Sequence, residues 1–553
     1  MKKLLLLLAS LSCIQSFAQM QLMIASGTQG FGNNWDAAAS VTYDTQENIY
    51  VTGYFASDSI TFGNITLHNQ GGADMYIVKY DLVLNVQWAL SIGGSGGEYG
   101  QGITADSSNN IIVVGNFESA SIVMGNDTLV NHAAGTPDMF IARIDVNGNF
   151  LWARNEGGTN YDNCGGVDMN PVNGDIYVAG AYYLSDMIIE NDTFVNRGGY
   201  DMILMKFDLA GNYLWAQDGG GNLNDLGNGV AWDASSNHVV VSGGFAGDSL
   251  IFPNGDTLVN AFSGQPDIFV VKYDPSGNFV WSRRAGAADN DHSVSVDVDG
   301  NGQVYVAGHY HSLSFVVGND TLVNQGMGDA FLIAYDINGN PLWAKTAGGM
   351  DHDFGYHVWV DNGNRIYFSG MYMSSSITFG SFTHNNMMMG MEDLFLTMYA
   401  PWGFESGSLT GGGMGADYVA SLVSNIAGIY MVGGFTSTTL WAGSATLTNT
   451  DPSGNTGDAM VLTSFIPLNM TEPIDENNFS VYPNPGTGVF NFVNPQNENV
   501  RVEIFNAIGQ QVYISENNSA ATFAVDLSGE PAGIYFAKML TAEGFQTFTL
   551  IVE

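Results

Sequence analysis

Residues 74–81 read DMYIVKYD, and close variants of this stretch return along the whole chain. The variants are DMFIARID from Asp138, DMILMKFD from Asp201, DIFVVKYD from Asp267, DAFLIAYD from Asp329, DLFLTMYA from Asp393 and DAMVLTSF from Asp458, at spacings of 62–66 residues. Apolar, β-branched and aromatic residues dominate each copy, which predicts a buried strand. A fixed period of this length predicts a repeat architecture.

Two further elements recur with the same period. A stretch such as IYVTGYF or VYVAGHY is built around a central glycine in all seven repeats, at Gly53, Gly115, Gly180, Gly243, Gly308, Gly370 and Gly433. A tryptophan in stretches such as LWAR marks five of them, at Trp88, Trp152, Trp215, Trp281 and Trp343. Two independent signals therefore count seven units, and the third is lost at both ends of the array.

Each unit is interpreted as four short strands. The first two form a hairpin ending in the glycine-centred strand, and a long connection, often containing NDTLVN, leads to the DMFIARID-like strand and the tryptophan strand. The D-x-x-G-N turns at Gly148, Gly211, Gly277 and Gly339 suit hairpins that need a positive φ angle. A single unit cannot bury both faces of its sheet, so the sequence predicts a ring of seven blades, an all-β seven-bladed β-propeller.

The two ends of the array predict how the ring closes. The stretch from Leu22 to Ser26 matches the tryptophan strand of a unit, but no DMFIARID-like strand precedes it. The stretch from Ala459 to Phe465 matches the DMFIARID-like strand, but no tryptophan strand follows it. Pairing the two would complete one blade from both ends and remove two exposed strand edges.

The order of strands also predicts which face of the propeller binds a ligand. The connections between second and third strands and between blades lie on one face, and they are the long ones. We expect acidic loops on this face, at Asp225, Asp289, Asp291, Asp351 and Asp353. Because loops on a rigid scaffold commonly carry function, any glycan or protein ligand is expected there.

The repeats resemble a known family. The pattern in DVDGNGQVYVAG, residues 297–308, and in DNGNRIYFSG, residues 361–370, is similar to the bacterial β-propeller repeats known as SBBP. The resemblance covers roughly residues 20 to 466. It implies an extracellular propeller and implies no activity.

The N-terminus predicts export. Lys2 and Lys3 precede an apolar run from Leu4 to Ala9, and Ser16 to Ala18 supply the small residues of a cleavage site, so residues 1–18 are interpreted as a signal peptide and the propeller as residues 19–466.

Cys164 is then the only cysteine of the mature chain, and we expect it to be a small buried hydrophobic residue. No later stretch has the length of a membrane span. A net charge of −40 argues against nucleic acid and anionic lipid as partners.

The C-terminal part of the chain has a different pattern. Residues 467–478, PLNMTEPIDENN, are predicted to be a linker, and residues 479–553 contain five to seven short strands that predict a small β-sandwich. The motif residues Tyr482, Pro483, Asn484, Pro485, Gly509, Asp526, Gly533 and Tyr535 closely resemble the C-terminal sorting domain of type IX secretion cargo. This resemblance implies the type IX machinery as a partner and a domain that is commonly removed on release or surface attachment. An ordinary accessory sandwich is the alternative.

Acidic residues and histidines in two adjacent units suggest a weak candidate metal site. Its residues are Asp291, His292, Asp351, His352 and Asp353. No H-x-E-x-H or Cys/His spacing supports it, and a solvated His–Asp loop is the simpler interpretation. Calcium in the acidic connections stays open, although the DVDGNG stretch at Asp297 reads as a hairpin turn because its twelfth position is Gly308 rather than Glu.

No catalytic motif stands out from the sequence. We therefore expect a monomeric, non-enzymatic protein without a cofactor, secreted or held at the outer cell surface, that acts in binding, adhesion or display. One alternative is an extracellular hydrolase or lyase that acts on polysaccharide through the long-loop face. A purely structural surface-layer component is the other.

Overall fold

The computed structural model describes two compact units, one within Phe17–Ile466 and one within Pro467–Glu553. Each is described by itself. Within the described segments no helix has the length and apolar character needed to cross a bilayer. The structure describes residues 22–25, 35–82, 84–253, 255–388, 390–425, 428–442, 445–449, 456–464, 480–482, 488–494, 499–506, 511–515, 519–531, 533–540 and 545–552.

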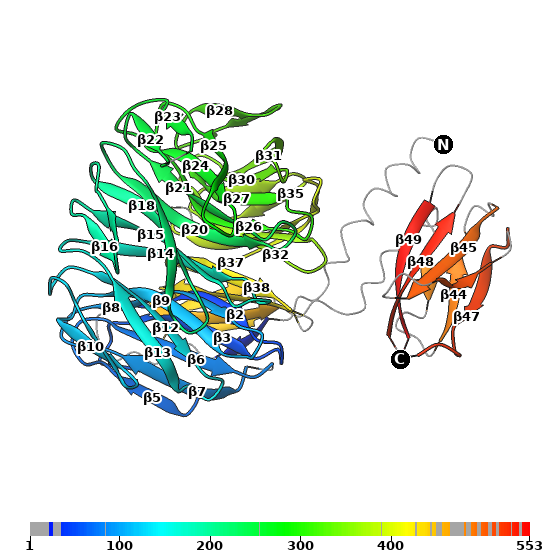
Figure 1. Cartoon of the computed structure of the whole chain (residues 1–553). Helices are drawn as coiled ribbons and strands as arrows, with labels where there is room; N and C mark the ends of the chain where they lie inside the picture. Colours follow the sequence, from blue (N-terminus) through cyan, green and yellow to red (C-terminus); the bar gives the residue numbers. More distant parts are fainter. Residues whose placement is uncertain are drawn as a thin grey trace. The chain divides into compact units, whose positions relative to one another are not determined.

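The first unit contains seven four-stranded antiparallel blades (Figure 1). Blade 1 consists of β2 (Asp36–Tyr43), β3 (Ile49–Phe55), β6 (Asp74–Tyr80) and β7 (Val86–Ile92). Blade 2 consists of β8 (Glu98–Ala105), β9 (Ile111–Phe117), β12 (Asp138–Ile144) and β13 (Phe150–Glu156). Blade 3 consists of β14 (Asp162–Met169), β15 (Ile176–Tyr183), β18 (Tyr200–Phe207) and β19 (Tyr213–Gly219). Blade 4 consists of β20 (Asp225–Asp233), β21 (His238–Phe245), β24 (Asp267–Tyr273) and β25 (Phe279–Ala285).

The last three blades follow the same order. Blade 5 consists of β26 (Asp291–Val298), β27 (Val304–Tyr310), β30 (Asp329–Tyr335) and β31 (Pro341–Ala347). Blade 6 consists of β32 (Asp353–Val360), β33 (Ile366–Tyr372), β36 (Asp393–Tyr399) and β37 (Glu405–Gly412). Blade 7 consists of β38 (Asp417–Ser424), β39 (Ile429–Phe435), β42 (Asp458–Ser464) and β1 (Leu22–Ala25).

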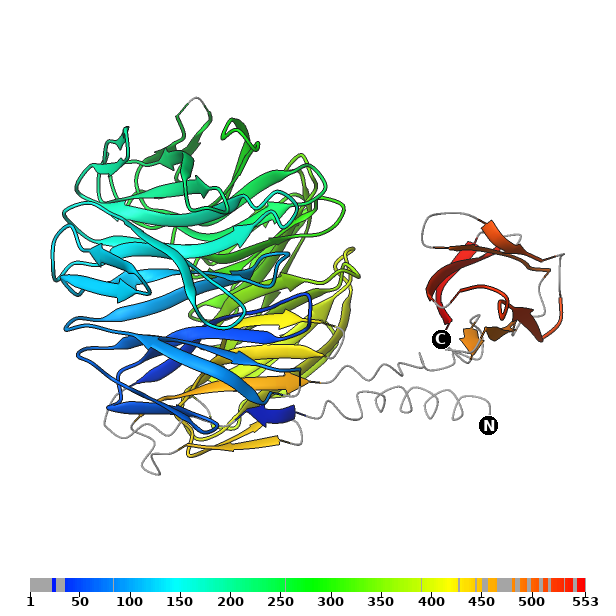
Figure 2. The same cartoon turned by 60° about the horizontal axis from the view of Figure 1, so that its bottom comes forward.

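The ring closes as the sequence predicts. Strand β1, the N-terminal strand of the described chain, pairs antiparallel with β42, with Leu22 opposite Ser464 and Ala25 opposite Val461 (Figure 2). The first strands of consecutive blades contact one another around the ring, including β2 of blade 1 with β38 of blade 7. The first strands therefore surround the central axis, and the seven-bladed propeller is confirmed.

The long connection in each unit is not the simple loop that the sequence suggests. Each of the seven connections contains its own two-stranded hairpin. The hairpins are β4 (Ser59–Phe62) with β5 (Ile65–His68), β10 (Ser121–Met124) with β11 (Asp127–Val130), β16 (Met187–Ile189) with β17 (Asp192–Phe194), β22 (Ser249–Ile251) with β23 (Thr257–Val259), β28 (Ser314–Val317) with β29 (Asp320–Val323), β34 (Ser376–Phe379) with β35 (Phe382–Asn385), and β40 (Thr439–Ala442) with β41 (Ala445–Thr448). The expectation of four strands per unit is thus corrected to six, of which four form the blade.

The repeated glycine of the second strand has a packing role. Every first strand carries a β-bulge near its third residue, which turns a backbone carbonyl toward the second strand. A Cβ at Gly308 would lie 1.9 Å from the carbonyl oxygen of His292, and one at Gly370 would lie 1.9 Å from that of Phe354. Glycine is therefore required because any side chain would collide with the bulged strand.

This close approach predicts the effect of one added methyl group. Gly308→Ala should lower the free energy of unfolding by about 2 kcal/mol or more, because the bulge or the second strand must move. Urea denaturation measures the change. Gly300→Ala is the control, since its Cβ would meet only the side-chain oxygen of Asn364, at an ordinary 3.5 Å. Equal stabilities of the two variants would contradict the packing role.

The repeated tryptophan joins neighbouring blades. Its indole N–H donates to a backbone carbonyl in the D-x-x-G-N-type turn of the next blade. The five bonds are Trp88 to Val146 at 3.0 Å, Trp152 to Leu209 at 3.1 Å, Trp215 to Pro275 at 3.1 Å, Trp281 to Ile337 at 3.1 Å and Trp343 to Pro401 at 2.8 Å. In each turn a glycine with positive φ packs against the indole, as at Gly339 with φ 77°. The predicted positive φ angles are confirmed at the other three predicted turns as well.

The C-terminal unit is a small sandwich. One sheet has the order β43 (Ser480–Tyr482), β44 (Val489–Val493) and β47 (Thr522–Asp526), and the other has the order β46 (Gln511–Ile514), β45 (Arg501–Asn506), β48 (Gly533–Leu540) and β49 (Phe545–Val552). Both sheets contribute to one apolar core, for example Phe490 from the first and Ile504 from the second. The predicted β-sandwich is confirmed.

Candidate ligand-binding face

The long-loop face of the propeller opens onto the central axis. The first and third residues of the first strands are buried, while the second residue is partly exposed in six of the seven. Because the first strands surround the axis, these second residues line its opening. We call this set the axial mouth: Tyr99, Asn163, Leu226, His292, Phe354 and Tyr418.

Four histidines gather at the mouth around Phe354. The rings of His292 and His309 lie 5.7 Å apart, those of His309 and His311 5.8 Å, and those of His311 and His352 5.5 Å, measured between centroids. Phe354 lies 4.3 Å from His309 and 5.5 Å from His352. We call these five residues the histidine cluster, and it joins blade 5 to blade 6.

Burial keeps the centre of the histidine cluster uncharged. Desolvation and then the neighbouring histidines lower the pKa of His309 to about 3, and burial also lowers the pKa of His292. The Nδ1 atoms of His309 and His352 are buried and have no hydrogen-bond partner. A neutral imidazole near neutral pH offers both a hydrogen-bond donor and an acceptor to a ligand.

Aromatic rings continue from the histidine cluster along the mouth. The ring centroids of Phe354 and Tyr356 are 6.4 Å apart, and those of Tyr356 and Tyr418 are 6.2 Å apart. Between blades 1 and 2, the rings of Tyr54 and Tyr99 lie 5.1 Å apart in an edge-to-face arrangement. Together with the histidine cluster these residues form an aromatic arc from blade 5 through blade 7 to blade 2.

The part of the mouth at blades 2 and 3 also carries polar groups. The side-chain amide of Asn116 donates to Asn163 at 3.2 Å, and Asn163 donates to the hydroxyl of Tyr200 at 3.3 Å. The backbone N–H of Cys164 donates to Asn116 at 2.9 Å. Cys164 itself is buried, and desolvation raises the pKa of its thiol to about 12, which confirms the expectation of a small buried residue. The opening thus combines ring faces with amide and hydroxyl groups.

Three of the acidic residues expected in exposed loops are buried instead. Asp225, Asp291 and Asp353 are the first residues of β20, β26 and β32, and their side chains have 0% exposure. Asp353 accepts the N–H of Gly349 at 2.7 Å and the hydroxyl of Ser374 at 2.6 Å. These carboxylates therefore fix the start of the first strand, and the expectation that they project into solvent is wrong.

The candidate metal residues lie in different surroundings. His292 and His352 belong to the histidine cluster, whereas Asp291 and Asp353 are fully buried. The backbone N–H of Asp351 donates to Ser374 at 2.9 Å. In the described part of the chain, no group of three or more His, Cys, Asp and Glu side chains is arranged to hold a metal ion. A metal or calcium ion on this face stays a prediction.

The acidic DVDGNG stretch forms the hairpin turn that the sequence predicts. Asp299 accepts the N–H of Asn301 at 2.8 Å and that of Gln303 at 2.9 Å through one carboxylate oxygen. The preceding Asp297 is half-buried in β26, and it accepts the N–H of Val360 from blade 6 at 2.6 Å. The two aspartates therefore serve the turn and the blade junction.

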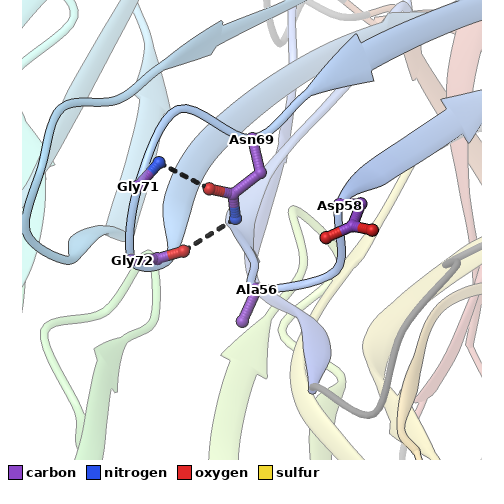
Figure 3. A pocket seen from close by; sticks show the side chains of 5 residues that line it. All are labelled: Ala56, Asp58, Asn69, Gly71 and Gly72. Atoms are coloured by element: carbon purple, nitrogen blue, oxygen red, sulfur yellow. Dashed lines mark hydrogen bonds between the residues drawn. The ribbon is translucent and has the colours of Figure 1, made fainter.

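A depression of about 600 Å³ lies elsewhere on the propeller, in blade 1 (Figure 3). Ala56, Asp58, Asn69, Gly71 and Gly72 line it, and Asn69 uses its amide to accept from Gly71 at 2.8 Å and to donate to Gly72 at 2.7 Å. The equivalent asparagine of blade 2, Asn131, makes the same type of bonds, with Ala133 and Thr136. This depression follows from a structural turn of the repeat, which distinguishes it from the axial mouth.

The motif residues of the tail divide between described and undescribed parts of the chain. Pro483, Asn484, Pro485 and Gly509, like the predicted signal peptide and linker, lie outside the described residues. Tyr482 ends β43, Asp526 ends β47 and Gly533 begins β48. Tyr535 is buried in the sandwich core, and its hydroxyl donates to the carbonyl of Pro531 at 2.7 Å. The described motif residues thus have structural places at strand ends and in the core.

Two curated proteins match parts of the chain. The uncharacterized WD repeat-containing protein L264 of Acanthamoeba polyphaga mimivirus is 24% identical over 365 residues, 54% of this chain and 26% of the viral protein. The regulatory protein FlaEY of Caulobacter vibrioides is 30% identical over 196 residues, 34% of this chain and 20% of that protein. The chain therefore spans between a fifth and about a quarter of the length of these curated relatives.

Comparison with solved structures finds weak similarities. The match to a mutant of puromycin hydrolase covers 84% of this chain and 59% of the hydrolase chain, at 10% identity and a TM-score of 0.39. The match to a catalytically inactive variant of virginiamycin B lyase from Staphylococcus aureus covers 80% of this chain and 99% of the lyase chain, at 9% identity and a TM-score of 0.30. At these values the likeness says nothing about activity.

The tail has a clear relative. Residues 480–553 match the family described as the secretion system C-terminal sorting domain. Such a domain supports export to the cell surface or the extracellular space by the type IX secretion system. The chain thus carries a secretion system C-terminal sorting domain at residues 480–553, preceded by a seven-bladed β-propeller.

Proposed function

We propose that the exported propeller is a non-enzymatic binding module whose axial mouth takes an uncharged carbohydrate. The proposal rests on one observation, the aromatic arc of half-buried rings beside hydrogen-bonding side chains at the opening of the axis. Ligand sites combine aromatic walls with a few placed polar groups in this way. A sugar ring, which has apolar C–H faces and a polar edge, matches both parts.

Charge supports an uncharged ligand. The chain has a net charge of −40, which disfavours anionic sugars and phosphates at long range. The central imidazole of the histidine cluster is neutral because burial and its histidine neighbours lower its pKa. The mouth therefore offers hydrogen bonds rather than a positive charge.

Two buried aspartates next in sequence to histidines of the cluster support binding without turnover. Asp291 accepts hydrogen bonds from the N–H groups of Ala287, His311 and Ser312 and from the Ser312 hydroxyl, at 2.7–3.2 Å. Asp353 is held in the same way by Ser374 and its neighbours. Carboxylates fixed in this manner are structural, whereas a glycosidase needs two that face the substrate.

The proposal is tested by removing one ring of the arc. With a glycan that the full chain binds, Phe354→Ala should raise the dissociation constant by roughly tenfold or more, because a half-buried aromatic ring that would stack on the sugar is lost. Isothermal titration calorimetry measures it, and a thermal melt checks that the variant is folded. Trp402→Ala is the matched control, since Trp402 is 76% exposed in the turn between β36 and β37, on the opposite face. Unchanged affinity of Phe354→Ala would exclude the axial mouth as the site.

A further inference from the structure

Two carboxyl groups meet at every junction between blades. An aspartate at the first or second residue of a third strand faces the first residue of the next blade's first strand, and both are buried. The seven pairs are Asp74 with Glu98, Asp138 with Asp162, Asp201 with Asp225, Asp267 with Asp291, Asp329 with Asp353, Asp393 with Asp417, and Asp458 with Asp36. Six pairs are separated by 24 residues, and the seventh closes the ring.

Glycines bring the two carboxyl groups of a pair together. A Cβ at Gly286 would lie 2.5 Å from Asp267 Oδ1 and 2.9 Å from Asp291 Oδ2. At the junction of blades 5 and 6, a Cβ at Gly348 would lie 2.3 Å from Asp329 Oδ1. The carboxyl groups therefore pack directly on backbone at the end of the fourth strand, where water has no room beside the glycine.

The two members of a pair have different hydrogen bonds. Asp353 accepts four, from the N–H groups of Gly349, Met373 and Ser374 and from the Ser374 hydroxyl, at 2.6–3.2 Å. Asp329 accepts only the N–H of Gln325, at 3.0 Å, and its Oδ1 is buried without a partner. Hydrogen bonds to a carboxylate favour its charged form, so Asp353 is the member that keeps the charge.

Of the six pairs separated by 24 residues, three have a basic partner and three do not. Asp138 lies 2.7 Å from His132, Asp201 lies 3.2 Å from Arg197, and Asp267 lies 2.5 Å from Arg284. No ion pair in the described part of the chain involves Asp74, Asp329 or Asp393. At these three junctions two buried negative charges would face each other without compensation, which is strongly unfavourable.

Raised carboxyl pKa values occur at both kinds of junction, since burial also raises the pKa of Asp162 to about 7 and that of Asp225 to about 8. Burial, and then the charge of Asp353, raises the pKa of Asp329 to about 7. Burial is also the first cause that raises the pKa of Asp74 and that of Asp393 to about 6, and it raises the pKa of Asp417, the partner of Asp393, to about 7. The other titratable groups that face Asp329 and Asp393 are the phenols of Tyr310 and Tyr372, whose own pKa values are raised and which stay neutral.

We propose that each of these three junctions carries one negative charge and one proton shared by its two carboxyl groups, and that the ring is therefore held more tightly at mildly acidic pH. The unfolded chain releases this proton near pH 4, whereas the folded chain keeps it to between pH 6 and 7. In this interval the folded state binds more protons. Its stability therefore falls as the pH rises from 4 to 7 and stays low above that.

The test compares thermal unfolding of the full chain at pH 5.5 and pH 8.0. The wild type should melt at the higher temperature at pH 5.5. Asp329→Asn and Asp393→Asn imitate the protonated side chain, so each should melt roughly 2 °C or more above the wild type at pH 8.0 and show a smaller difference between the two pH values. Asp267→Asn is the control, because it removes the partner of Arg284 and should melt lower at both pH values.

Calcium and proton counting complete the test. Calorimetric unfolding of the wild type at pH 6.0, in buffers of different ionisation enthalpy, should show protons released, and this readout needs no variant. Proton uptake, or an unchanged pH dependence in Asp329→Asn and Asp393→Asn, would overturn the proposal. A second result would also overturn the proposal. If calcium chloride raised the melting temperature of the wild type but not of these variants, a cation rather than a proton would compensate the charge of the pair.

Discussion

A chain that ends at Ile466 is expected to stay inside the cell envelope, with its external amount reduced to near the detection limit. The deleted part contains the sorting domain at residues 480–553, which supports export, while the propeller has its own apolar cores and a closed ring without it. Quantitative mass spectrometry of periplasm, cell surface and culture medium from the native host measures the distribution.

The control for this experiment is a full-length chain with a surface change in the propeller. Lys345→Ala alters a side chain that is 36% exposed and leaves the tail untouched, so its export should match the wild type. Equal external amounts of the truncated chain and the wild type would contradict the role given to the tail. Peptide coverage of the external wild type also shows whether residues 480–553 are removed.

Loss of one buried ion pair is expected to have the largest effect on stability. Lys272 in β24 and Asp233 in β20 are 1% and 0% exposed, and Lys272 Nζ lies 2.6 Å from Asp233 Oδ2. Lys272→Ala leaves the carboxylate buried without its cation and should lower the free energy of unfolding by about 3–5 kcal/mol. Urea denaturation at pH 7 measures the loss.

The effect of Lys272→Ala should depend on pH in a defined direction. Although burial alone would raise it, hydrogen bonds from Lys272 and two serines hold the pKa of Asp233 below its ordinary value. The stabilisation is therefore complete above about pH 4 and is lost as the pH falls through the lower folded value. Lys345→Ala is again the control, since its pair with Glu405 spans 4.0 Å at the surface and should contribute less than about 1 kcal/mol. If the two variants lost similar amounts of unfolding free energy, burial of the ion pair would not be the reason for the effect of Lys272→Ala.

The sequence predicts the ring because its strongest signals are structural. The DMYIVKYD-like strand and the glycine each make a contact that every blade needs, and the tryptophan makes the same contact in five of them, so all three repeat with the blade. The connection hairpins have only three or four residues per strand, as in Asp127–Val130, and such short alternation is too weak to predict a strand. Stretches such as NDTLVN therefore look like loop sequence although they pair.

The acidic residues were harder to place from sequence. Charged residues are mostly exposed in proteins, so Asp225, Asp291 and Asp353 beside glycines suggest solvated loops. The repeated separation of 24 residues from the third-strand aspartate to the next acidic residue was present in the sequence, and it is the signal of the junction pairs. This separation can be interpreted only when the first residue of each first strand is known. The β-bulge and the strand register determine that residue.

The histidine cluster is also set by register. Six of the nine histidines lie between His292 and His384, but only four of the six meet at the mouth. His357 lies further along β32, near Ser421, and His384 lies in the outer hairpin with Ser408. A change of one position in a strand turns a side chain from the axis into the blade, so composition alone cannot separate these two groups.

The most direct test of the binding account is to incubate the full chain with a panel of neutral and charged polysaccharides. Both the bound fraction and the release of new sugar ends are measured. The account predicts saturable binding of at least one neutral polysaccharide, weakened by Phe354→Ala and unchanged by Trp402→Ala, with no new sugar ends. Release of new ends by the wild type, or binding restricted to charged polysaccharides, would contradict it.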